Sequence, residues 1–303
     1  MRRIKDIGEF ELIKRLSKNI KVDKSVICGI GDDAAVIELI KDKYLVVTSD
    51  MLIEGRHFLK TDKPNNIGHK ALAASLSDIA AMGAVAKYAF ISLGLPKNTT
   101  LSYIDKIYKG IIKLAGKFNV SICGGDTNAS DKLTIDMTII GVIDKKRLVL
   151  RSGAKEGDFI LITGRLGGSL KSGHHLRFVP RLAESRYLVN NFKLNSMIDI
   201  SDGLVADLGH IITRSNVGAV IYEELIPRNK DAKSLNDVLY SGEDFELLFT
   251  MPQKQAKKFI KASHPKGMNF FIMGQIIKKP KEILFVDKKH KVKSLKIKGF
   301  RHF

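Results

Sequence analysis

The sequence lacks the features that mark several common classes of protein. It has no tryptophan and only two cysteines, Cys28 and Cys123, which lie far apart and form no CxxC pair. This argues against a disulfide framework and against a zinc site held by cysteines. No stretch approaches the roughly 18 apolar residues that span a membrane, and no apolar run of the signal-peptide kind follows the basic N-terminus. We expect a cytoplasmic protein without a membrane partner.

Motifs of the familiar nucleotide-binding and nucleic-acid-binding proteins are missing too. The glycine-rich stretch 163–173 lacks the G-K-[ST] order of a Walker A loop, and there is no kinase H-R-D loop. There is also no long basic arm, RNP-like aromatic motif or zinc-finger spacing. The formal net charge is nevertheless +19, with a pI of about 9.8. Such a charge favours anionic partners such as nucleotides or phosphates, or else reflects a lysine-rich composition.

The length of 303 residues, of which 44% are hydrophobic, is typical of two globular domains. Apolar runs rich in β-branched residues predict strands at 44–50, 88–96, 120–126, 132–143, 158–164, 218–225 and 245–251. Periodic apolar patterns predict helices at 65–82 (with asparagine caps), 101–118 and 201–215, and an N-terminal amphipathic helix carrying Ile4, Ile7, Leu12, Ile13 and Leu16. The polar segment 144–158 separates two apolar blocks. We therefore predict an α/β (α+β) chain with domains at 1–144 and 145–303.

One glycine-rich turn imitates a dinucleotide-binding site. The segment Gly29–Ala34, GIGDDA, fits the pattern G-x-G-x-x-G/A, and Asp50 lies near the spacing of a ribose ligand. That site requires a helix after the glycines, whereas the following AVIELIKDKYLVV is typical of a hairpin. Asp32 and Asp33 would also face the pyrophosphate with the same charge. We therefore expect no nicotinamide cofactor here.

Aspartates recur where apolar runs end, at Asp33, Asp50, Asp126, Asp199 and Asp202. Any one of them could cap a turn or a helix. The ends of strands at one edge of a sheet converge, however, and converging carboxylates repel one another unless a cation lies between them. Oxygen ligands without cysteine or histidine favour Mg²⁺.

Asp78 extends this set from a predicted helix. It shares a face of small side chains with Ala74 and Ser75 by the i, i+3, i+4 rule. A carboxylate on such a smooth face can lie close to a ligand. The alternative is a partly buried aspartate bonded to a neighbouring loop.

Nine segments in one order identify a family. They are GEFELI (8–13), GIGDDAAV (29–36), TSDMLIEGRHF (48–58), KALAASLSDIAAMGA (70–84), GGDT (124–127), RSGAKEGD (151–158), IDISDGLVADLGHI (198–211), SGEDFELLFT (241–250) and KGFRHF (298–303). The chain resembles the thiamine-monophosphate kinases of the AIR-synthetase (PurM-like) superfamily. EGRHF and the terminal KGF favour these over AIR synthetase or selenophosphate synthetase. The resemblance implies a PurM-like two-domain architecture with a mixed β-sheet in each domain, and ATP-dependent phosphorylation of thiamine monophosphate to thiamine diphosphate.

The resemblance also implies the residues of the site. Several Mg²⁺ ions would be held by Asp33, Thr48, Ser49, Asp50, Asp78, Asp126, Asp199 and Asp202. ATP would contact Gly125, Asp126, Arg151, Ser201 and Tyr108, and thiamine phosphate would contact His57, Glu243 and Phe300. A homodimer is implied as well. Without their motifs, His57 would be interpreted as a surface histidine, Glu243 as a solvated charge and Phe300 as C-terminal packing.

Two departures from the family pattern are visible. Ser241 replaces the first of two glycines before Glu243, and Phe178–Val179 stand where the family often has a proline-containing stretch. Asp32 has no implied ligand role and is expected to cap its turn or to support the ligands. Another PurM-like ATP enzyme and a basic nucleic-acid-binding protein are the alternatives; clustered aspartates disfavour the second, because without metal they would repel phosphate.

Overall fold

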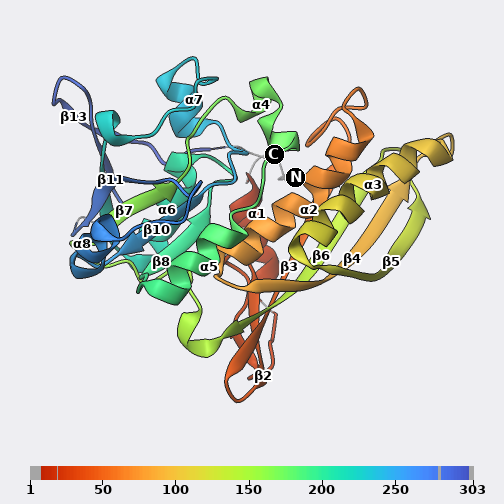
Figure 1. Ribbon diagram of the computed structural model, residues 1–303, viewed down its shortest axis with the longest axis horizontal. Coiled ribbons are helices and arrows are strands. Elements are labelled where there is room, and N and C mark those ends of the chain that lie inside the picture. The colour runs from red at the N-terminus through yellow and green to blue at the C-terminus, as the bar shows by residue number, and fades with distance from the viewer. Residues whose placement is uncertain (1–7, 19, 279–280, 300–303) are drawn as a thin grey trace.

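Two β-sheets, one in each half of the chain, form the frame of the protein (Figure 1). The computed structural model describes residues 8–18, 20–278 and 281–299. Within these ranges, the N-terminal sheet has the strand order β1 (Val26–Cys28), β2 (Ala35–Ile40), β3 (Lys43–Ile53), β6 (Thr134–Asp144), β4 (Val85–Leu95) and β5 (Ser121–Ala129). The C-terminal sheet has the order β13 (Val292–Leu295), β12 (Ile283–Val286), β9 (Gly218–Tyr222), β11 (Phe270–Ile277), β7 (Phe159–Thr163), β10 (Leu247–Met251) and β8 (Ser196–Asp199). Both sheets are mixed, as expected, because β4–β5 and β9–β12 pair in parallel while their other neighbours are antiparallel.

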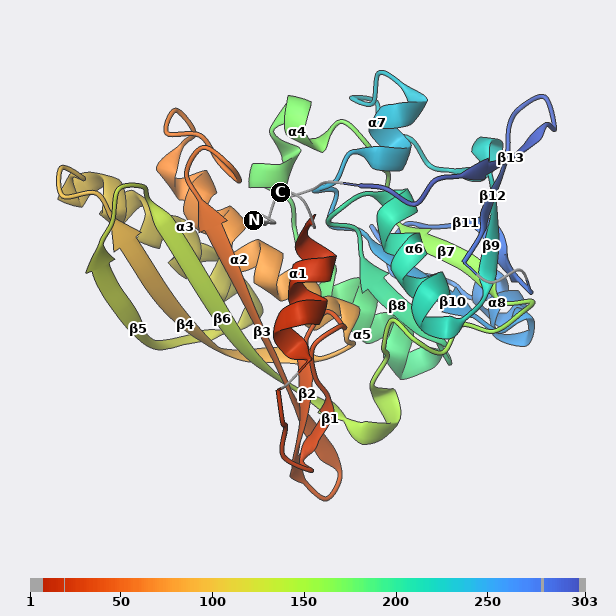
Figure 2. The same cartoon turned by 180° about the vertical axis from the view of Figure 1, so that it is seen from behind.

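Helices cover one face of the N-terminal sheet and both faces of the C-terminal sheet. Helices α2 (Pro64–Ala81) and α3 (Leu101–Phe118) lie on one face of the N-terminal sheet, while Figure 2 shows the opposite face of β4, β5 and β6 in front of them. In the C-terminal half, α5 (Leu182–Asn191) and α8 (Gln253–Lys261) pack on one face of the sheet, and α6 (Leu204–Ser215) packs on the other with α7 (Leu235–Tyr240). Helices α1 (Gly8–Ser17) and α4 (Ser169–Ser172) are shorter.

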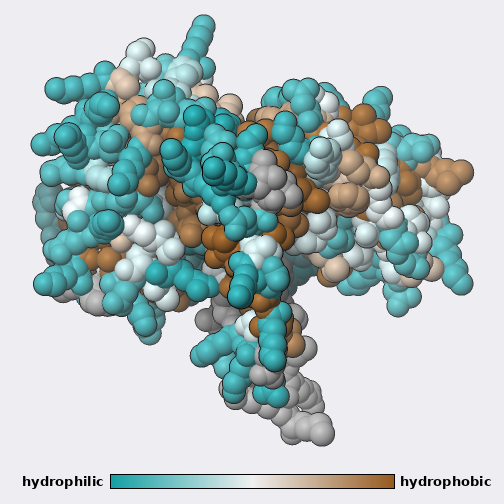
Figure 3. Space-filling model, turned by 90° about the horizontal axis from the view of Figure 1, so that it is seen from below, coloured by the Kyte–Doolittle hydropathy of each residue, from teal (hydrophilic) through white to brown (hydrophobic). Residues whose placement is uncertain are grey.

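One hydrophobic core joins the two halves. It includes Leu72 and Ile79 of α2, Ile139 of β6, and Met197 and Phe249 from the second sheet. A second cluster lies between the C-terminal sheet and α6. Helix α2 is thus buried between both sheets. From below, hydrophilic side chains cover most of the surface and hydrophobic ones gather toward the middle of the view (Figure 3).

The predicted elements mostly form, with boundaries corrected by local chemistry. Helix α3 has the predicted bounds, whereas α2 begins at Pro64 after Lys63, whose side chain makes no cap. The predicted asparagine caps are therefore wrong, because a proline with its fixed φ starts the helix. Helix α6 begins at Leu204 rather than at residue 201, since Gly203 before it has a φ of 113°.

The hairpin predicted after GIGDDA is confirmed. Strand β2 pairs antiparallel with β3, so no helix follows the glycines and the dinucleotide interpretation fails, as expected. Strands β3 and β5 run further than predicted, so Asp50 and Asp126 lie within strands rather than at their ends. In the described part of the N-terminal helix, Leu16 is 65% exposed, and Ile4 and Ile7 lie outside the described residues. Nowhere in the described ranges is a helix both long and apolar enough to cross a membrane.

Helices α2 and α3 approach each other closely through two glycines. A Cβ added to Gly68 would lie 2.0 Å from the carbonyl oxygen of Ile107, and one added to Gly110 would lie 2.0 Å from that of Asn65. Both contacts involve backbone atoms, which cannot rotate away as a side chain would. The position of α2 between the sheets therefore depends on these glycines.

Gly110 and Gly116 of α3 should respond to alanine in opposite ways. Gly110→Ala forces the helices apart and should lower the free energy of unfolding by about 1–3 kcal/mol. Gly116→Ala meets nothing within 4 Å and should raise it by about 0.5–1 kcal/mol, as a helix-interior glycine replacement does. Urea titrations measure both. Equal effects of the two substitutions would contradict close packing at Gly110.

Candidate active site

A cavity of about 710 Å³ is lined by residues from both halves of the chain. Its walls come from the end of β3, one face of α2, the end of β8, and the loops before α6 and β10. Most of the predicted site residues line it: Asp33, Thr48, Ser49, Asp50, His57, Asp78, Arg151, Asp199, Ser201, Asp202 and Glu243. Segments up to about two hundred residues apart thus meet in one place.

Three carboxylates meet at the centre of the cavity. Oxygens of Asp33, Asp78 and Asp199 all lie within 4.8 Å of one another. The Thr48 hydroxyl donates a hydrogen bond to Asp78 at 2.5 Å, and the Ser77 hydroxyl donates one to Asp199 at 2.6 Å. These hard oxygen donors fit a divalent cation such as Mg²⁺.

Burial changes the acidity of this cluster. Burial first, and the neighbouring carboxylates second, raise the pKa of Asp78 well above its usual value and that of Asp199 to about 8. Burial likewise raises the pKa of Asp50, with Asp136 and Asp33 adding to the effect. A bound cation would reverse these shifts by stabilising the ionised forms.

Arg151 supplies the positive charge beside the cluster. Its guanidinium donates two hydrogen bonds to Asp33, from Nε at 3.1 Å and from Nη2 at 2.8 Å. Asp32 holds the same segment through the backbone. Its carboxylate accepts hydrogen bonds from the backbone N–H groups of Asp33 and Arg151 at 3.0 and 3.1 Å. Asp32 therefore caps the turn and holds the backbone of Asp33 and Arg151, which is one of the roles that the sequence left open.

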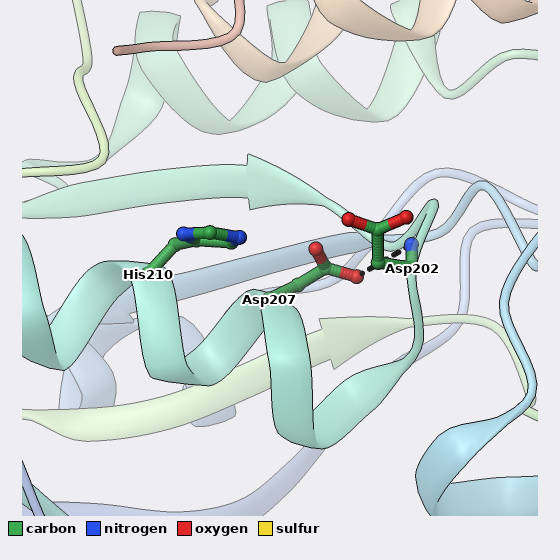
Figure 4. A group of neighbouring side chains, drawn as sticks. All are labelled: Asp202, Asp207 and His210. Atoms are coloured by element: carbon green, nitrogen blue, oxygen red, sulfur yellow. Dashed lines mark hydrogen bonds between the residues drawn. The ribbon is translucent and has the colours of Figure 1, made fainter. Parts of the chain in front are cut away.

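A second polar group, drawn in Figure 4, also lines the cavity. Ligand atoms of Asp202, Asp207 and His210 lie within 4.8 Å of one another. Asp207 accepts the backbone N–H groups of Asp202 and Gly203 at 3.1 and 3.0 Å, which fixes the turn before α6. Burial raises the pKa of Asp207 well above normal and lowers that of His210 to about 4. Sequence reasoning missed Asp207 and His210, although their i, i+3 spacing in one helix was a usable signal.

His57 and Glu243 mark the other end of the cavity. The backbone N–H of Ile53 donates to Nδ1 of His57 at 2.9 Å, so the proton of the neutral ring lies on Nε2. Glu243 has a φ of 63°, and its N–H donates to the carbonyl of Ser201 at 2.7 Å. This left-handed backbone turns the Glu243 segment toward the cavity.

Other predicted residues do not line this cavity. Gly125 and Asp126 lie in the exposed edge strand β5, where Asp126 accepts a hydrogen bond from Asn128 at 2.7 Å. In the sheet register Asp126 lies level with Met51 of β3, three strands away, which is about 14 Å. Tyr108 packs partly buried in α3. Phe300 lies outside the described residues, and the roles of all four stay predictions.

The two departures from the family pattern are accommodated. Ser241 has a φ of −81°, which any residue adopts, so glycine is not needed there. Phe178 is buried and stacks on Phe245, with ring centroids 4.0 Å apart and planes inclined by 6°. Its carbonyl also bonds to Nε2 of His69 at 2.6 Å. The unusual loop residue therefore packs beneath the Glu243 loop.

Comparison with known proteins decides the family. Residues 31–143 match the AIR synthase related protein, N-terminal domain, and residues 155–287 match its C-terminal domain. The thiamine-monophosphate kinase of Buchnera aphidicola (Schizaphis graminum strain) is 38% identical over 98% of this chain and 99% of its own length. The chain belongs to the thiamine-monophosphate kinase family. The Escherichia coli K12 member is 32% identical over 98% of both chains.

The PurM-like fold of this family is equally clear in three dimensions. A solved structure described as AaThiL complexed with AMPPCP and TMP superimposes with a TM-score of 0.87 and 30% identity, covering 100% of this chain and 99% of that one. The predicted α/β architecture is thereby confirmed, as is membership of a kinase family. The domain boundary at 144/145 stays a prediction.

The raised pKa values make magnesium binding depend on pH. The folded protein holds protons on Asp78 and Asp199 that the unfolded chain has lost above about pH 4, so its stability falls as pH rises toward about 8. Mg²⁺ competes with those protons. The rise in Tm caused by Mg²⁺ over EDTA should therefore be larger at pH 8 than at pH 6, and smaller in Asp78→Asn. A Mg²⁺ effect independent of pH would refute this.

Proposed function

We propose that this chain transfers the γ-phosphoryl group of ATP directly to the phosphate of thiamine monophosphate, giving thiamine diphosphate and ADP. The observation that carries the proposal is the single cavity that combines three converging carboxylates, Arg151, and the His57–Glu243 end. Membership of the kinase family and the likeness to a structure with an ATP analogue support it.

The main obstacle to this reaction is repulsion between two phosphate groups. Mg²⁺ held by Asp33, Asp50, Asp78 and Asp199, with Thr48, Ser49 and Asp202 nearby, would supply the positive charge that neutralises and aligns them. Arg151 adds a fixed cation for the ATP phosphates. Its ion pair with Asp33 holds the guanidinium at the edge of the carboxylate cluster until the phosphates compete for it.

No general base is required. The acceptor is a phosphate monoester whose second pKa is about 6, so it is mostly a dianion at neutral pH and can attack without losing a proton. We expect direct, in-line transfer without a phosphoenzyme. His57 would donate Nε2–H to the acceptor, and Glu243 would bind it from the C-terminal half.

We also propose a homodimer that completes the site. On the sheet face away from α2 and α3, Met51 is 54% exposed, Tyr88 48% and Phe90 38%. Asp126 pairs with Ser92, which lies on the same face of β4 as Tyr88 and Phe90. A second copy packed here would bury these side chains and bring its Asp126 toward this chain's cavity. The cytoplasmic location stays a prediction.

Asp50→Asn should leave the fold intact and lower kcat at least about a hundredfold, because a metal-binding carboxylate becomes neutral. Asp158→Asn is the matched control. Asp158 is also a buried aspartate, but it bonds to Lys155 and Asn195 away from the cavity, so its loss should lower Tm with little effect on kcat. Thiamine diphosphate formation from ATP and thiamine monophosphate measures both, with other phosphate acceptors tested in parallel. Near-normal turnover by Asp50→Asn would exclude the carboxylate mechanism.

Mixing two inactive variants tests the shared site. Asp50→Asn and Asp126→Asn should each be inactive alone. After unfolding and refolding together, half of the dimers are mixed and each has one intact site, so about a quarter of the activity should return. If Asp126 serves its own chain, every site carries one substitution and the mixture stays inactive.

A further inference from the structure

Lys70 is the most deeply buried cation near the cavity that the proposed mechanism does not use. It lies on α2 with only 1% of its surface exposed, among Ile67, Ala71 and other apolar neighbours of the same helix. Burying an ammonium group without a partner is costly. Burial lowers the pKa of Lys70, and the charge of Glu243 opposes that effect.

The partners of Lys70 come from both halves of the chain. Its Nζ donates a hydrogen bond to the backbone carbonyl of His57 at 2.7 Å. It also donates a short hydrogen bond to Oε2 of Glu243, with which it forms an ion pair. Both partners line the cavity, as Lys70 does. One ammonium group thus joins the segment after β3 to the loop before β10.

We infer that Lys70 is a positioning residue for the phosphate acceptor, because it fixes the separation and direction of His57 and Glu243. Lys70 holds Oε2 of the Glu243 carboxylate, and this fixes the direction in which the other oxygen, Oε1, points. Oε1 would then accept a hydrogen bond from thiamine monophosphate. Nζ of Lys70 also holds the backbone carbonyl of His57, and this helps to fix the position of the His57 ring. The inference rests on the proposed function, in which these two side chains bind thiamine monophosphate.

The helix adds a second constraint. Lys70 and Asp78 lie in the same α-helix, eight residues apart, which corresponds to about 12 Å along the axis. Asp78 belongs to the carboxylate cluster proposed to hold the metal. Helix α2 therefore sets the distance between the acceptor-binding end of the cavity and the place where the phosphoryl group is transferred.

The test is a set of KM values for thiamine monophosphate and for ATP, measured on the full-length protein. Lys70→Gln should raise the acceptor KM about tenfold or more, since one partner of a buried charged pair is lost, and change the ATP KM less than about twofold. Lys70→Arg, which keeps the charge, should recover part of the loss. In a Glu243→Gln background, Lys70→Gln should have a much smaller effect, because the two residues act through one contact.

Arg181→Gln is the matched control. Arg181 is less buried than Lys70, but it too forms an ion pair with a buried carboxylate, Glu246, and neither residue lines the cavity. Its loss should lower Tm as Lys70→Gln does and leave the acceptor KM unchanged. If Lys70→Gln does not fold, Lys70→Arg is measured instead, with an expected rise of about threefold confined to the acceptor KM.

Two results would overturn the inference. One is an unchanged acceptor KM, or an equal rise of both KM values, in the Lys70 variants. The other is full additivity with Glu243→Gln. A wild-type protein that makes no thiamine diphosphate would instead refute the proposed function, so the two failures are distinguishable.

Discussion

The ion pair between Arg151 and Asp33 holds the cavity together at the point where like charges crowd. Asp33 belongs to the N-terminal half, and Arg151 follows the segment that leads into the C-terminal half. Asp32 adds backbone hydrogen bonds across the same junction. Three carboxylates from separate elements lie within 4.8 Å of one another, and a buried cluster of this kind is tolerated only with protons, a guanidinium or a metal to offset its charge. The two halves therefore have to stay joined here for the cluster to exist.

Helix α2 carries this arrangement into the core. Its small residues pack against β3 and β6, and Ser75 donates to the carbonyl of Met137 at 3.2 Å. Ser77 and Asp78 then reach the carboxylate cluster from the same helix. Close packing on α3 through Gly68 and Gly110 fixes the height of the helix over the sheet. A polar cavity is thus built on an element whose own position is set by apolar and backbone contacts.

The sequence predicted the frame and most of the cavity, for physical reasons. Alternating strands, helix α3 and the hairpin after GIGDDA follow from local patterns. Asp33, Asp199 and Asp202 are found from their positions after apolar runs, but they come from two sheets rather than from one edge of a single sheet. Lys70 could not be assigned in this way, because a lysine in an apolar helix face acquires its meaning only from Glu243, 173 positions away. Asp126 does not line the cavity of its own chain, because it pairs with Ser92 on the face of the sheet away from α2 and α3. Its implied role as a metal ligand stays a prediction.

The backbone around Glu243 is held in its conformation before the phosphate acceptor binds. Glu243 and Phe245 both adopt left-handed conformations, with φ of 63° and 51°, each costing roughly 1–3 kcal/mol for a residue with a side chain. Stacking of Phe245 on Phe178 offsets part of that cost before any ligand arrives. Little chain entropy then remains to be lost on binding, so the acceptor meets a rigid receptor. Association should accordingly approach a simple one-step encounter rather than a slow ordering of the loop.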